Sequence, residues 1–332
     1  MKHKIYLVLL LFLMVDLTFG QQQSLFTNIL MNPYLYNPAY AGSNKTLQLN
    51  LNYRDQYAGF DGAPKTFAAS GYSSLKKYQN MALGGMINYD KSGLLGRTSF
   101  YASYTYHLKL SKKLSAGFGI SAGGVQYNVK IYDAKPYPGD KDDVFLRSDV
   151  LNAFAFDANA GFYLYSKNFY FGVSSQQMVN ARIHWDNTLG RLTPLYYVTS
   201  GYTFYVDEKK EWGIQPSVLA RFSAPHPYQL EYSLRGIYKN AFWIGGTYRT
   251  NASMSAMFGC TINKAYTIGY SYDYTLSALN NYSSGSHEIV LTYTRPVKKK
   301  KTVGEKVQDA DEDELNKIDN SIKTNLKNKK KE

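Results

Sequence analysis

Residues 228–235 read Tyr-Gln-Leu-Glu-Tyr-Ser-Leu-Arg, an unbroken alternation of apolar and polar side chains. The same alternation fills residues 47–54, where three leucines and a tyrosine alternate with Gln, Asn, Asn and Arg. Successive side chains of a β-strand point to opposite faces of the sheet, so each stretch predicts a strand with one apolar and one polar face.

This period-two pattern recurs from residue 46 to residue 297 and predicts about fourteen strands. The predicted strands cover 46–57, 66–76, 81–90, 97–110, 113–129, 154–167, 169–179, 192–207, 211–224, 228–239, 241–250, 254–264, 266–279 and 286–297. Many run for about 10–14 residues, whereas globular strands have a mode of about 5–6 and a bilayer needs about 9–11. The pattern therefore predicts an all-β fold, a transmembrane antiparallel β-barrel.

The predicted connections alternate in length, which supports the strand count. Every second one is short and carries lysine, whereas the others are longer, notably 130–153, 180–191 and 277–285. The lysines of the short connections are Lys76, Lys77, Lys112, Lys113, Lys167, Lys209, Lys210, Lys239 and Lys264. Short periplasmic turns and longer outer loops are typical of bacterial barrels, so we assign the lysine-rich turns to the periplasm.

The first twenty residues predict export. Lys2 and Lys4 precede an apolar run over 5–15, and Thr18 and Gly20 supply small residues before Gln21. This is the pattern of a cleaved secretory signal peptide, 1–20, whose apolar run is too short for a transmembrane helix. An exported barrel is not exposed to nucleic acid, so we do not infer nucleic-acid binding from the net charge of +13.

Two further segments flank the predicted barrel, 46–297. Residues 21–45 hold two Asn-Pro steps among aromatic side chains, and we expect residues 24–45 to fold into the lumen as a plug, since they are too apolar to leave in water. In this plug the Asn32 and Asn37 amides are expected to pair with Arg54 and Glu288. Residues 298–332 form a charged tail expected in the periplasm, and two interpretations stay open for it, a disordered segment or a short amphipathic helix.

Several ionisable residues fall on the predicted lumen face, and no enzyme motif accompanies them. Two interpretations stay open, a binding or gating network and the charge pairs that fill any polar barrel interior. The candidates are Arg54, Glu231, Arg235, Asp273 and Glu288, with His107, Lys109, Asp157, Arg221 and Arg249. His287 and Glu288 are neighbours in one strand and face opposite sides, so they cannot converge on one substrate. We expect no catalytic, cofactor-binding or metal site.

The sequence resembles a known family along residues 26–297. The stretch 31–42, Met-Asn-Pro-Tyr-Leu-Tyr-Asn-Pro-Ala-Tyr-Ala-Gly, is similar to the opening motif of the PorP/SprF proteins of the type IX secretion system. The matching residues that we single out are Asn32, Pro33, Asn37, Pro38, Ala39, Tyr40 and Gly42. The likeness continues through 53–56, 62–66, 84–93, 270–273 and 285–289. Tyr57 stands where the family often has Trp, and the tail is longer than is typical.

The resemblance implies an outer-membrane barrel that serves type IX secretion and, in some members, gliding motility. PorP-like members belong to the machinery and are linked to periplasmic ring proteins, here through the C-terminal tail. SprF-like members accompany one large surface adhesin. The implied partners are therefore secretion components or an adhesin, together with outer-membrane lipids. A passive or substrate-specific pore remains the alternative.

Overall fold

The computed structural model describes residues 26–27, 29–130, 151–185, 188–224 and 226–297. The predicted signal peptide 1–20, residues 21–25 and the tail 298–332 lie outside these residues, so their structure stays a prediction. No helix in the described part of the chain is long and apolar enough to cross a membrane.

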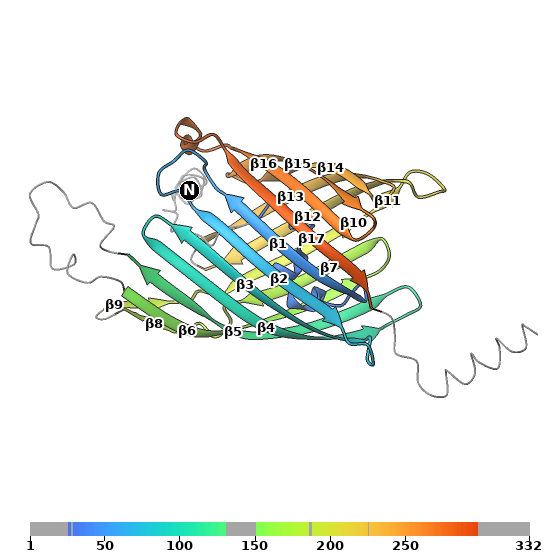
Figure 1. Cartoon of the computed structure of the whole chain (residues 1–332), viewed down its shortest axis with the longest axis horizontal. Helices are drawn as coiled ribbons and strands as arrows, with labels where there is room; N and C mark the ends of the chain where they lie inside the picture. Colours follow the sequence, from blue (N-terminus) through green and yellow to red (C-terminus); the bar gives the residue numbers. More distant parts are fainter. Residues whose placement is uncertain (1–25, 28, 131–150, 186–187, 225, 298–332) are drawn as a thin grey trace, which may run out of the picture.

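The described strands form one closed antiparallel barrel (Figure 1). Their bounds are β1 Thr46–Asp55, β2 Lys65–Ser74, β3 Met81–Ser92, β4 Leu95–Lys109, β5 Ser115–Val129, β6 Leu151–Tyr165, β7 Phe169–Gln176, β10 Leu195–Tyr202, β11 Phe204–Tyr205, β12 Trp212–Ser223, β13 His226–Tyr238, β14 Phe242–Arg249, β15 Ser253–Ile262, β16 Tyr266–Thr275 and β17 Ser286–Pro296. Strands adjacent in this order pair with each other, except β10 and β11, which both pair with β12, and β1 pairs with β17 to close the barrel. The predicted 14-strand barrel is confirmed when β10 and β11, which lie along the same neighbour β12, are counted as one strand of the wall.

The barrel carries its apolar side chains outside and its polar side chains inside. On β1, Leu49 and Leu51 are 49% and 47% exposed, whereas Asn50 and Asn52 between them are each 1% exposed. A water-soluble sheet protein has the opposite arrangement. An apolar exterior around a polar interior matches a barrel that meets lipid outside.

Tight turns join the strands at the lysine-rich end. The turn between β13 and β14 places Lys239 and Asn240 at φ of 52° and 53°, and the turn between β15 and β16 places Asn263 and Lys264 at 51° and 56°. Two consecutive residues with positive φ make the type I′ turn, whose twist suits a two-residue hairpin. This end of the barrel is also the end at which β1 begins and β17 ends.

The structure departs from the predicted strand pattern at two places. The chain between β7 and β10 contains a separate hairpin, β8 Arg182–Trp185 and β9 Thr188–Arg191, where a plain loop was expected. The predicted strand 192–207 is interrupted at Thr203, which separates β10 from β11.

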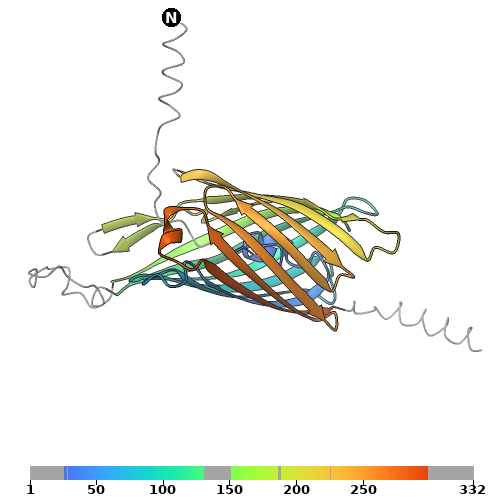
Figure 2. The same cartoon turned by 90° about the horizontal axis from the view of Figure 1, so that it is seen from above.

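Residues 26–27 and 29–45, here called the inner segment, lie within the barrel (Figure 2). The segment contains two short 3₁₀ helices, η1 Pro33–Leu35 and η2 Pro38–Tyr40, and η2 contacts β4, β5 and β6. A third 3₁₀ turn, η5 Ala278–Asn281, lies in the connection between β16 and β17. A barrel of about eight strands is filled by its own side chains, so a larger one has room for such a segment.

Candidate functional site

The two Asn-Pro steps shape the inner segment. Pro33 and Pro38 each open a 3₁₀ helix, a position that suits proline because its φ is preset and its missing N–H has no helical partner. Asn37 caps η2, since its Oδ1 accepts a hydrogen bond from the backbone N–H of Ala39 at 2.9 Å. The motif thus folds into two compact turns, not a continuous helix or strand.

The amides of the two asparagines tie these turns to the barrel wall. Asn32 Nδ2 donates to Asn52 Oδ1 at 2.9 Å and to Ser70 Oγ at 3.0 Å. Asn37 Nδ2 donates to the backbone oxygen of Phe162 at 2.9 Å. The expected pairing of these amides with Arg54 and Glu288 is therefore wrong. Arg54 and Glu288 bind each other and Thr27, and the asparagine amides bind uncharged groups of the wall.

Wall glycines bring the motif close to the strands. A Cβ added to Gly119 would lie 2.3 Å from Ala39 N, and one added to Gly161 would lie 2.0 Å from Asn37 Oδ1. Real Cβ atoms do not approach other heavy atoms so closely, so only glycine fits at these two wall positions. Gly42 of the motif has a φ of 82°, a left-handed conformation that favours glycine.

The remaining motif residues are buried against neighbouring strands. Ala39 is fully buried, and the Tyr40 ring packs edge-on against Tyr72 and Tyr163 at centroid distances of 6.0 Å and 5.3 Å. The backbone oxygen of Pro38 accepts a hydrogen bond from Thr105 Oγ1 at 2.8 Å.

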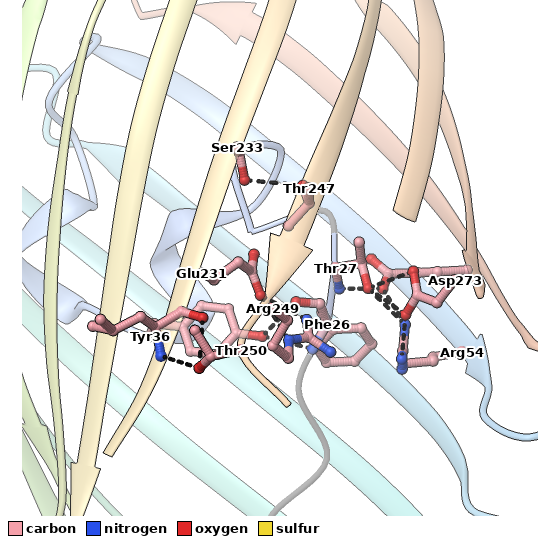
Figure 3. Close-up of polar contacts among 12 residues, drawn as sticks. Phe26, Thr27, Tyr36, Arg54, Glu231, Ser233, Thr247, Arg249, Thr250 and Asp273 are labelled. Carbon is pink, nitrogen blue, oxygen red and sulfur yellow. Dashed lines mark hydrogen bonds and ion pairs between the residues drawn. The ribbon is translucent and has the colours of Figure 1, made fainter. Parts of the chain in front are cut away.

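A buried charged cluster holds the start of the inner segment (Figure 3). Arg54 on β1 lies 2.6 Å from Asp273 on β16 and 3.3 Å from Glu288 on β17. Thr27 joins all three side chains. Its N–H donates to Glu288 Oε2 at 2.6 Å, its hydroxyl donates to Asp273 Oδ2 at 2.7 Å, and Arg54 Nη1 donates to that hydroxyl at 2.9 Å. We call these four residues the Thr27 cluster.

Glu231 and Arg249 form a second buried pair. They face each other across β13 and β14, and Arg249 Nη2 lies 2.7 Å from Glu231 Oε2. Figure 3 shows this pair near Tyr36 and Phe26 of the inner segment, and a hydrogen bond of 2.8 Å joins Phe26 N to the Tyr36 hydroxyl. Such pairs stabilise a fold only while both partners remain, because a single buried charge is costly.

Arg235 belongs to neither pair. Its guanidinium donates to Gln215 Oε1 at 2.6 Å and lies over the ring of Trp243 at 5.6 Å. The candidate residues therefore form three separate groups. Of the other candidates, His107, Asp157 and Arg221 are buried, whereas Lys109 lies at the end of β4 and is exposed.

Several wall residues that bind the inner segment carry no charge and were not singled out from the sequence. Gln176 Nε2 donates to Leu35 O at 2.8 Å, and Ser174 Oγ donates to Tyr36 O at 2.7 Å. Tyr34 shares a hydrogen bond of 2.5 Å with Ser103. All three wall residues lie on polar faces of predicted strands, which is the one signal that could have identified them.

The described residues contain no group of three or more His, Cys, Asp or Glu side chains arranged to hold a metal ion. The chemistry that the interior does offer is buried ion pairing and hydrogen bonding to backbone. The ion-paired Glu288 and Asp273 bind Thr27, and Gln176 binds the backbone of Leu35, so both kinds of contact hold the chain's own inner segment.

Comparisons with known proteins describe the barrel and the family separately. No curated protein matches the chain. Among solved structures, the Pseudomonas putida toluene transporter TodX is similar at 10% identity with a TM-score of 0.47, over 81% of this chain and 95% of that one. A Pseudomonas aeruginosa FadL homologue is similar at 11% identity with a TM-score of 0.47, over 79% and 93%.

The family comparison covers most of the sequence. Residues 18–293 match the family described as type IX secretion system membrane protein PorP/SprF. The match includes the Asn-Pro motif and all but the last residues of β17. The chain belongs to the PorP/SprF family of type IX secretion system membrane proteins.

Proposed function

We propose that this barrel supports the secretion or surface attachment of partner proteins, such as a large adhesin, by the type IX system. The observation that carries the proposal is the interior, where Thr27 and the two Asn-Pro turns are bound to the wall by buried contacts. A general pore needs a water-filled lumen. A lumen occupied by the protein's own chain instead suits a protein that acts by binding other proteins at the two ends of the barrel.

The proposed partners follow from the orientation. The lysine-rich turns and the tail 298–332 face the periplasm, where the tail binds periplasmic ring proteins of the secretion system. The outer loops face the exported partner, and the apolar wall contacts outer-membrane lipids. A signal peptide removed before Gln21 delivers the chain, and the protein catalyses no reaction.

A deletion strain tests the proposal. Surface proteins of the parent and the deletion strain are compared by mass spectrometry after protease shaving of intact cells. Loss of one large adhesin indicates the SprF-like role, and loss of all type IX cargo indicates the PorP-like role. An unchanged set of surface proteins would reject both roles.

The alternative function is a passive or substrate-specific pore. It predicts that the deletion strain keeps its surface proteins and takes up a solute more slowly. The same strain therefore separates the two functions, and the plasmid-borne gene restores whichever property was lost.

A further inference from the structure

Strand β6 is paired along its whole length on its β5 side but along only part of its length on its β7 side. It pairs with β5 along its whole length, from Leu151 opposite Val129 to Tyr165 opposite Ser115. With β7 it pairs only from Ala160 to Tyr165. The chain leaves the wall after β7 and returns at β10, and the β8–β9 hairpin projects at the end where β6 begins (Figures 1 and 2).

One hydrogen bond shows which backbone groups of β6 face the side without a neighbour. The N–H of Met178 donates to Ala158 O at 3.0 Å, so the backbone of Ala158 points toward the β7 side. Backbone groups of an extended strand point alternately to its two sides, and the register with β5 has no shift. The N–H and C=O groups of Asn152, Phe154 and Phe156 therefore face the free side.

No strand of the described residues pairs with β6 over 152–156 on that side. The element beside it, β8, has β9 as its strand partner. Lipid cannot satisfy these backbone groups, because hydrocarbon offers no hydrogen bonds. They need a hydrogen-bonding group such as water, a polar side chain or another strand.

The free edge also lacks the features that usually protect an edge strand. Proteins shield exposed edges with lysine, proline or a bulge, whereas residues 152–156 read Asn-Ala-Phe-Ala-Phe. Phe156 is 74% exposed and Phe154 is 46% exposed. Their rings contact each other edge-on at 5.0 Å, and the Phe154 ring stacks with Phe100 at 6.2 Å, which forms an apolar surface beside the edge.

We propose that the free edge of β6, residues 152–156, is the docking site for one β-strand of the exported partner protein. The partner strand adds to the β5–β6 sheet through the backbone groups of Asn152, Phe154 and Phe156, and its apolar side chains cover Phe154 and Phe156. Strand addition of this kind takes affinity from the main chain and selectivity from alternate side chains. The inference rests on the proposed function, which supplies the partner.

Two substitutions of the same residue test the backbone role. Phe156→Pro removes an N–H on the free side, a position at which an edge strand tolerates proline, whereas Phe156→Ala keeps the N–H and removes the ring. We expect Phe156→Pro to lower the amount of partner on intact cells at least tenfold, and Phe156→Ala to lower it less than threefold. Both variants should retain the parent's abundance and heat-modifiable migration.

The outcomes separate this inference from the proposed function. A Phe156→Pro strain with normal surface partner, beside a deletion strain that lacks it, overturns the docking site and leaves the function standing. A deletion strain that loses no surface protein overturns both. Equal loss in the proline and alanine variants overturns strand addition, because the ring alone then accounts for binding. Phe154→Pro, with its N–H on the same side, replaces Phe156→Pro if that variant does not fold.

Hydrogen exchange on the purified barrel in nanodiscs provides a test without substitutions. The amides of residues 152, 154 and 156 should exchange at least a hundredfold faster than those of 153, 155 and 157, which bond to β5. Slow exchange at all six amides in the isolated barrel would overturn the proposal, since the chain's own residues would then occupy the edge.

Discussion

At the scale of single residues, the interior depends on charges that have no access to water. Arg54, Asp273 and Glu288 have side chains 3%, 2% and 0% exposed. The two carboxylates face one guanidinium and are further satisfied by Thr27. Removing the arginine would leave two like charges buried side by side, which is strongly destabilising.

We therefore predict that Arg54→Met lowers the free energy of unfolding by about 3–5 kcal/mol. Urea unfolding of the barrel refolded into lipid vesicles measures it. The control is Lys65→Met, since Lys65 and Asp55 lie 3.6 Å apart with side chains 58% and 26% exposed. Breaking that exposed pair should cost below about 1 kcal/mol. Equal effects of the two substitutions would mean that the Arg54 site is hydrated.

A second prediction concerns the outer face. Leu234 is 56% exposed near the middle of β13, so Leu234→Arg should cost about 2–4 kcal/mol at the depth of the bilayer midplane. Tyr282 is 70% exposed in the connection after β16, at one end of the barrel, and Tyr282→Arg should cost about 1 kcal/mol or less there. The same unfolding assay compares them. A cost at Tyr282 as large as that at Leu234 would contradict a lipid-facing β13.

The sequence predicts the face of such residues but not their partners. Alternation alone assigns Arg54 and Asp273 to the polar face of their strands, because a strand has a period of two. Their contact depends on the register of β1, β16 and β17, which alternation does not contain. Nothing in the sequence marks Thr27 as a partner of these charges, because it is uncharged and lies before the Asn-Pro motif.

At the scale of elements, the strands follow from the pattern and the irregular pieces do not. Most predicted strand ends lie within a few residues of the observed ones, as at β1 and β17. The β8–β9 hairpin was missed because alternation cannot be recognised in strands of only 4 residues. The interruption at Thr203 was missed for a related reason, since β11 has only 2 residues.

The inner segment yields a prediction at this scale. Gly119→Ala places a methyl group where Ala39 and Pro38 now lie, so η2 must move away from β5. In a Cys260→Ser background, a cysteine at the buried position Ala41 should react with maleimide at least tenfold faster when Gly119→Ala is added. The matched control is Gly85→Ala, where the nearest atom to an added Cβ is 3.6 Å away and labelling should stay slow. Fast labelling in the control would mean that the assay reports general loosening of the barrel.

At the scale of the whole molecule, the inner segment runs along the barrel from one end toward the other. Thr27 binds Arg54 and Asp273, near the ends of β1 and β16 that lie away from the lysine-rich turns. Gly42 lies beside Ser74 and His107, at the lysine-rich end. Its contacts therefore follow most of the length of the lumen, and a solute crossing the barrel would have to pass beside it.

The last prediction follows from this path through the lumen. In planar lipid bilayers the intact protein should be nearly silent, because the inner segment occupies the space that water would need. A version lacking residues 24–45 should open stable channels, since a barrel of this strand number is wider than its own side chains can fill. A version lacking 302–332, a truncation outside the barrel, should stay silent and controls for the effect of shortening the chain. Porin-like conductance of the intact protein would reject the plug and make the pore the leading function.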